Sequence, residues 1–138
     1  MNKYTFEEIH VGLEESFTVE ITEESMSAFL GITGDVNPLH ADEAYAKEKG
    51  FSSRVAYGML TASYLSTLAG VYLPGERSLI YGVDIEFPKP VYIGDVLTVT
   101  GTVSSKDERF GMFVMDVVIK RENGQKVCRG KMKMGVLK

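Results

Sequence analysis

The chain contains 138 residues, 44% hydrophobic and 25% charged, and its 15 basic and 19 acidic residues give a net charge of −4. This length predicts one domain, residues 1–138, and the negative charge argues against a nucleic-acid partner, which needs a clustered basic surface. The single cysteine, Cys128, excludes an internal disulfide and favours a cytoplasmic location.

The first elements predicted along the chain are a strand and a short helix. Residues 16–22 alternate between apolar and polar side chains and are expected to form a strand, whose apolar face holds Phe17, Val19 and Ile21. Residues 22–25 (TEES) then match a capping box, which predicts a helix over residues 24–31.

A turn and a second short helix follow. Pro38 keeps the residue before it out of the helical conformation, so residues 33–40 are expected to form a turn. Asp42 is a suitable cap and Gly50 a suitable stop for a helix over residues 42–49.

The next segment, residues 55–75, contains no charged residue. A membrane-spanning helix needs about 20 apolar residues, but seven small, polar or helix-breaking residues interrupt this run: Gly58, Thr61, Ser63, Ser66, Thr67, Gly70 and Pro74. We therefore expect no membrane partner. The segment predicts a helix over residues 59–73 that is apolar nearly all round and must be surrounded by protein.

The second half of the chain alternates with a period of two and predicts four strands. Their apolar faces are Leu79, Tyr81, Val83, Ile85 and Phe87; Leu97, Val99 and Val103; Phe113, Met115, Val117 and Ile119; and Cys128, Gly130, Met132, Met134 and Val136. Residues 122–125 (ENGQ) indicate a hairpin turn between the last two strands.

These elements predict an α+β fold in which a curved antiparallel sheet wraps around one long apolar helix. Such an arrangement leaves edge strands and a large apolar surface exposed. We therefore expect a homodimer, or a dimer of dimers, that continues the sheet from one chain to the next.

The turn at residues 33–40 brings together residues capable of proton transfer. Asp35, Asn37 and His40 lie within six residues, and a carboxylate beside an imidazole is a common arrangement for moving protons near neutral pH. The alternative is structural, with Asp35 stabilising the turn and His40 as its neighbour. Asp35, His40 and Asp42 include only one histidine and no cysteine, which is a weak ligand set for zinc, so no metal is expected.

The entry to the long helix is a second candidate site. The first N–H groups of a helix are unpaired and carry partial positive charge, and Gly58 would let a ligand approach them. Such a site suits a carbonyl oxygen that gains negative charge during a reaction. Alternatively, Gly58 is only a cap or a packing glycine. Cys128 is disfavoured as a nucleophile because it lies on the apolar face of a strand.

Taken together, these segments resemble one protein family. Residues 33–40 (TGDVNPLH), then Tyr45-Ala46 and residues 55–60 (VAYGML), are similar to the hydratase motif of the MaoC-like, (R)-specific enoyl-CoA hydratases. Residues 87–95 (FPKPVYIGD) also resemble the segment that comes after this motif in the family, and the resemblance extends from about Phe6 to Met134. It implies the hotdog fold, a curved antiparallel sheet around a long helix.

The resemblance also implies roles for individual residues. Asp35 and His40 would be the catalytic pair, and Asn37 would orient the turn and its water. The backbone N–H of Gly58 would bind the thioester oxygen, and the Ser66 hydroxyl would lie near the site. The chain departs from the family at Tyr57, where many members have His, which leaves the role of that side chain open.

The reaction implied is the reversible syn addition of water to a trans-2-enoyl-CoA, giving the (R)-3-hydroxyacyl-CoA, with the CoA thioester as substrate and no cofactor. Arg54 and Lys89 are candidates for binding the CoA phosphates because they are cationic and near the motifs. Two alternatives are an acyl-CoA thioesterase with the hotdog fold and a non-catalytic acyl-CoA-binding module.

Overall fold

In the computed structural model, which describes residues 1–138, five strands form one antiparallel sheet in the order β1-β3-β4-β5-β2. The strands are β1 (Glu14–Glu20), β2 (Ser78–Glu86), β3 (Val96–Asp107), β4 (Met112–Arg121) and β5 (Lys126–Val136). Only β3, β4 and β5 follow one another in both sequence and sheet. The distant strands β1 and β2 therefore form the two edges.

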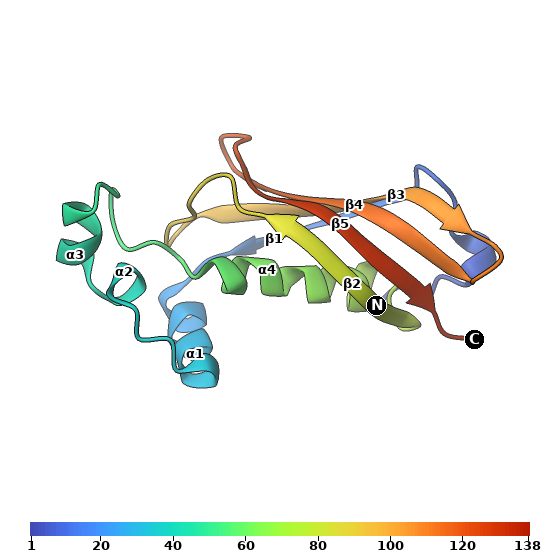
Figure 1. Ribbon diagram of the computed structural model, residues 1–138, viewed down its shortest axis with the longest axis horizontal. Coiled ribbons are helices and arrows are strands. Elements are labelled where there is room, and N and C mark those ends of the chain that lie inside the picture. Colours follow the sequence, from blue (N-terminus) through green and yellow to red (C-terminus); the bar gives the residue numbers. More distant parts are fainter.

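The helical elements lie along the sheet and beyond one end of it. They are η1 (Phe6–Glu8), α1 (Glu23–Thr33), α2 (Pro38–Ala41), α3 (Glu43–Glu48) and α4 (Gly58–Thr67), which continues as a π-helical turn, η2 (Leu68–Tyr72). Figure 1 shows α4 running beneath the curved sheet, while α1, α2 and α3 gather at the end where α4 begins. This arrangement confirms the predicted α+β fold.

The core lies between the sheet and the long helix. The predicted alternation is confirmed on the three central strands, because their inward residues are buried: Leu97, Val99, Val103, Phe113, Met115, Val117, Ile119, Cys128, Met132 and Met134. Leu68 and Ala69 of η2 are fully buried against them. Burial of these apolar surfaces is the main favourable contribution to folding.

Several local predictions are also confirmed. Thr22 caps α1 through a capping box with Ser25, and Asp42 caps α3 by accepting a hydrogen bond from the Tyr45 amide. Strand β1 occupies residues 14–20 and so begins two residues earlier than predicted, although Ile21 directly after it is buried.

On the edge strand β2, the predicted inward face holds for Val83 and Ile85 but is wrong for Leu79 and Tyr81. A register shift between Ile80 and Gly82 leaves Tyr81 without a partner on β5, so the inward face changes from even to odd residues across this bulge. Ile80 thus joins Val83 beside α4. The ring of Tyr81, which is 60% exposed, packs against Gly135, where an added Cβ would come within 2.5 Å of it.

The long helix is less enclosed than predicted. It occupies residues 58–72, close to the expected range, but Met59 on α4 is 64% exposed, and Gly58, Ser63 and Ser66 are also exposed. The prediction that protein surrounds this helix is therefore wrong for one chain, because the sheet covers only one side of it. None of the helices combines the length and the hydrophobicity that crossing a bilayer requires.

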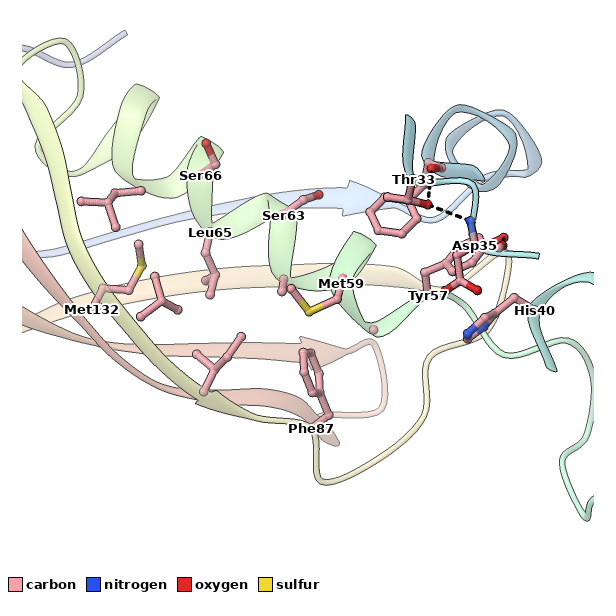
Figure 2. Close-up of a pocket in the computed structure, with 16 residues that line it drawn as sticks. Thr33, Asp35, His40, Tyr57, Met59, Ser63, Leu65, Ser66, Phe87 and Met132 are labelled. Atoms are coloured by element: carbon pink, nitrogen blue, oxygen red, sulfur yellow. Dashed lines mark hydrogen bonds between the residues drawn. The ribbon is translucent and has the colours of Figure 1, made fainter. Parts of the chain in front are cut away.

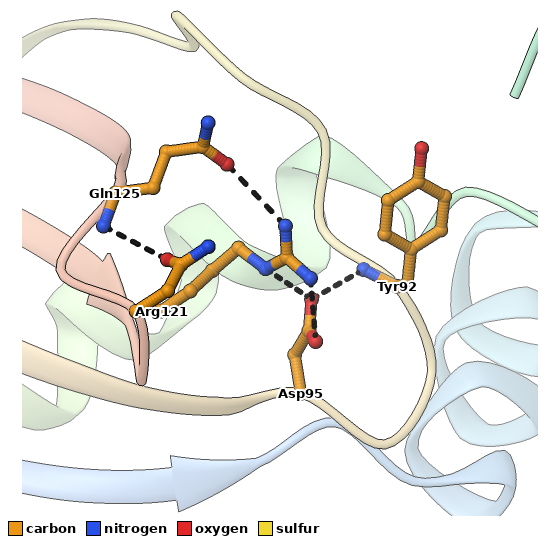
Figure 3. A network of polar contacts seen from close by, with 5 residues as sticks. Tyr92, Asp95, Arg121 and Gln125 are labelled. Carbon is orange, nitrogen blue, oxygen red and sulfur yellow. Dashed lines mark hydrogen bonds and ion pairs between the residues drawn. The ribbon is translucent and has the colours of Figure 1, made fainter. Parts of the chain in front are cut away.

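A polar network fixes the turn that leads into β3. Arg121 at the end of β4 binds Asp95 with its Nε 2.9 Å from Oδ2, and that same oxygen accepts a hydrogen bond from the Tyr92 amide (Figure 3). The carbonyl of Gln125, in the hairpin between β4 and β5, accepts a bond from the Arg121 amide. Nearby, the amide of Ala56 bonds to the carbonyl of Val91, which joins this turn to the segment before α4.

Candidate active site

A cavity of about 810 Å³ lies between α4 and β2, and its lining is mostly apolar. Strand β2 and the residue that follows it contribute Ile80, Val83, Ile85 and Phe87, while β5 contributes Met132. Asp35 and His40 lie at one end of the cavity (Figure 2). Gly58, the first residue of α4, also lines it and directly follows Tyr57 at that end. The cavity is thus mostly apolar and carries its carboxylate and its imidazole at that end.

Asp35 lies just beyond the end of α1. The helix stops at Gly34, which has a φ of 71°, a left-handed conformation that favours glycine. The Asp35 carboxylate accepts a hydrogen bond from the Asn37 amide at Oδ1 (3.1 Å). That bond is the turn-stabilising contact of the structural alternative. The other carboxylate oxygen, Oδ2, makes no hydrogen bond within the chain and can therefore bind a ligand.

His40 lies in the short helix α2, so the predicted turn over residues 33–40 is confined to the segment between α1 and α2. Pro38, whose fixed φ suits the first position of a helix, begins α2. Nδ1 of His40 lies 2.7 Å from the carbonyl oxygen of Val55, which can only accept. The proton of a neutral ring is therefore on Nδ1, and Nε2 is left as an acceptor.

Tyr57 and Gly58 connect this pair to the start of α4. The Tyr57 hydroxyl donates to the Asp35 carbonyl oxygen (2.8 Å), and its ring centre lies 4.3 Å from that of His40. Burial, and then the nearby Asp35 carboxylate, raise the pKa of Tyr57, so its hydroxyl stays protonated near neutral pH. Gly58 is the first residue of α4, and its N–H has no partner within the helix.

Of the remaining predicted site residues, only one lines the large cavity. Ser66 lines the cavity, whereas Asn37 caps α2 by accepting from the Leu39 amide and does not line it. Arg54 also lies outside the cavity, with its guanidinium bound to the His40 carbonyl and the Glu23 carboxylate, both at 2.8 Å. Lys89 lines a smaller cavity of about 250 Å³.

Several residues of the site were not predicted from the sequence. Phe29, Phe87 and Met132 line the cavity, and the Val55 carbonyl holds His40. Their apolar character indicated only a place in the core. No local pattern could show that residues so far apart in sequence meet around one cavity.

The other chemistry considered finds little support in the structure. No three His, Cys, Asp or Glu side chains come together as possible ligands of a metal ion. Cys128 is fully buried on β5, and burial raises its pKa to about 11. A thiol is a weak nucleophile when protonated, so Cys128 is a core residue.

Comparison with known proteins identifies the family. The MaoC-like domain family matches residues 6–124. The chain belongs to the MaoC-like dehydratase family. This MaoC-like chain is 38% identical over 99 residues to an (R)-specific enoyl-CoA hydratase of Rhodospirillum rubrum, covering 72% of this chain and 69% of the relative. It is 34% identical over 100 residues to the enzyme of that name from Aeromonas caviae, covering 72% and 75% of the two chains.

Solved structures show that the MaoC-like chain has the hotdog fold of R-hydratases. It superposes on R-hydratase PhaJ1 of Pseudomonas aeruginosa, in its unliganded form, with a TM-score of 0.90 and 30% identity, covering 96% of this chain and 85% of the other. The resemblance first seen in residues 33–40 and 55–60 is thus confirmed for family and fold. The MaoC-like chain is a hydratase/dehydratase of that family.

Proposed function

We propose that the protein is an (R)-specific enoyl-CoA hydratase, which adds water reversibly and syn to a trans-2-enoyl-CoA to give the (R)-3-hydroxyacyl-CoA. The observation that carries this proposal is the arrangement of Asp35, His40 and the first N–H of α4 at the polar end of a mostly apolar cavity. This end offers two proton-transfer groups and one hydrogen-bond donor, while the rest offers an apolar surface to an acyl chain.

In the proposed mechanism, Asp35 and His40 hold one water molecule between Oδ2 and Nε2, the atoms that make no hydrogen bond within the chain. The Gly58 N–H binds the thioester carbonyl oxygen. The oxygen of the water attacks the β-carbon, and one of its protons reaches the α-carbon on the same face by way of the pair. The enolate oxygen that develops is stabilised by the helix N–H and by the partial positive charge at that end of α4.

The acyl tail would extend along α4 away from this polar end. Leu65 and Met132 border that part of the cavity (Figure 2), and burial of the tail against them would be favourable by about 0.8 kcal/mol per CH₂ group. Ser66 also lines the cavity and would place its hydroxyl near the acyl group.

Lys89 is the better candidate of the two cations for the CoA phosphates. It forms no ion pair, and it lines the smaller cavity that shares His40 and Gly58 with the large one. The guanidinium of Arg54 is already paired with Glu23. Phosphate contacts of both residues stay predictions, as does a cytoplasmic location.

A spectrophotometric assay with crotonyl-CoA, followed by chiral analysis of the product, tests the proposed reaction. We expect loss of the enoyl-CoA absorbance and formation of the (R)-3-hydroxy product. Release of free CoA from a saturated acyl-CoA, detected with a thiol reagent, would instead support the thioesterase. Binding of the thioester without either reaction would support the acyl-CoA-binding module.

We further propose that two copies of the chain pair through their β2 strands. This strand is an edge of the sheet, and the residues beside the open cavity are unusually exposed for apolar side chains: Met59 (64%), Val83 (49%) and Ile80 (42%). Antiparallel pairing of β2 with its copy about a twofold axis would continue the sheet. It would also cover the open side of the cavity.

Changing Val83 to Lys tests this dimer. A charge at this position would have to be buried without a partner, so we expect the variant to be monomeric by light scattering and the wild type to be dimeric. The matched control is Val11→Lys, because Val11 is 63% exposed and precedes β1 at the opposite edge of the sheet. A Val83→Lys protein as dimeric as the control would contradict pairing through β2.

A further inference from the structure

Tyr57 contacts each part of the proposed catalytic apparatus. It is almost fully buried, at 3% exposure, and it immediately precedes the first residue of α4. Its position before Gly58 joins it covalently to the helix N–H that would bind the thioester oxygen. Figure 2 shows its side chain between the helix and the segment that carries Asp35.

The hydroxyl of Tyr57 anchors the backbone of Asp35. Its bond to the Asp35 carbonyl oxygen joins residues 22 positions apart. The Asp35 segment is exposed to solvent, and its other hydrogen bonds are short-range, from the Asp35 amide to the Thr33 hydroxyl and from the Asn37 amide to the Asp35 carboxylate. The phenol is therefore the side chain that ties this segment to α4.

The ring of Tyr57 supports the imidazole of His40. The two ring centres are 4.3 Å apart, and the Tyr57 ring also packs against Phe29 of α1, with 4.9 Å between those ring centres. The bond from Nδ1 of His40 to the Val55 carbonyl restrains the imidazole at one nitrogen. Contact with the Tyr57 ring restrains its face, so together they fix where Nε2 points.

We propose that Tyr57 is a positioning residue. It holds the Asp35 carboxylate and the His40 imidazole at fixed positions relative to the first N–H of α4. It acts through the pair rather than on the substrate. This inference rests on the proposed hydratase function. Because small displacements of reacting groups have large effects on rate, loss of the anchor should lower turnover while binding is largely retained.

The test replaces Tyr57 by Phe, which keeps the ring and removes the hydroxyl. We expect kcat for crotonyl-CoA hydration to fall about tenfold and KM to change by less than about twofold. The matched control is Tyr64→Phe, because Tyr64 lies on α4, the helix that Tyr57 precedes, packs partly buried against the core and makes no side-chain hydrogen bond. A fall in kcat no larger than that of the control would overturn the proposal.

A double-mutant cycle separates positioning from direct contact. If Tyr57 acts through Asp35, the Tyr57→Phe change should cost less than about twofold in kcat once Asp35 has been replaced by Asn. A full tenfold cost in that background, or a rise in KM with kcat unchanged, would mean that the hydroxyl contacts the substrate itself, and would overturn the positioning role.

Hydrogen exchange gives a readout that does not depend on activity. The Asn37 amide donates to the Asp35 carboxylate, so its exchange should accelerate at least about threefold in Tyr57→Phe and stay unchanged in Tyr64→Phe. A wild-type protein that fails to hydrate crotonyl-CoA would contradict the proposed function alone. Equal exchange in the two variants would overturn the anchoring of Asp35 by Tyr57 whatever the activity.

Discussion

Replacement of Asp35 by Asn, or of His40 by Gln, is expected to lower the hydration rate by about 10²- to 10⁴-fold, the usual contribution of a positioned acid or base. Asn at position 35 keeps an oxygen that can accept the Asn37 amide, but it cannot take up a proton. Gln at position 40 retains a donor for the Val55 carbonyl but lacks the basic Nε2. Initial rates of crotonyl-CoA hydration measure the loss.

Both variants should remain folded, because Asp35 is exposed and His40 is only partly buried. Thermal unfolding checks this expectation. Suitable controls are Asp116→Asn, on an exposed ion pair of β4, and His10→Gln, whose ring bonds only to the Glu8 carbonyl. Turnover near the wild-type rate by both Asp35→Asn and His40→Gln would refute the assignment of the pair.

Replacement of Gly58 by Pro should remove the proposed oxyanion donor without breaking α4. Gly58 is the first residue of the helix, a position that accepts proline because its N–H has no partner within the helix. Tyr57 before it has φ −57° and ψ 123°, a conformation that a following proline allows. We expect kcat to fall by about 10²- to 10³-fold, as when one oxyanion donor is lost.

The comparison variant is Gly58→Ala, which keeps the amide. A Cβ at this position would meet the Phe87 ring at 3.8 Å, an ordinary contact, so this variant measures the cost of the added side chain alone. Equal rates for the Pro and Ala variants would show that the Gly58 N–H does not bind the developing oxyanion. Circular dichroism would verify that the helix is retained in each variant.

The strands of the core could be predicted because their signal is local. On β3, β4 and β5, alternate residues face the helix, and that period of two is written directly in the sequence. The bulge at Tyr81 was missed because it depends on the register between β2 and β5 and on the space above Gly135, not on the composition of β2.

The candidate site could be predicted in part for the same reason. Asp35 and His40 lie five positions apart, so a short turn and helix bring them to the same cavity, and Gly58 marks a helix start that local signals reveal. The position of Arg54 could not be predicted, because its partners are the His40 carbonyl and Glu23, 14 and 31 residues away. The position of a cationic residue near a motif does not show whether an acidic side chain, here that of Glu23, already pairs with it.

Local sequence was sufficient for the α+β class, the family, and the residue types that can transfer a proton, since each depends on neighbours along the chain. Three features emerged only from the folded chain: β2 lies beside α4 to form the cavity, the helix is open on one side, and Tyr57 reaches back to Asp35. They arise when distant segments pack against each other, and local periodicity carries no information about which segments will meet.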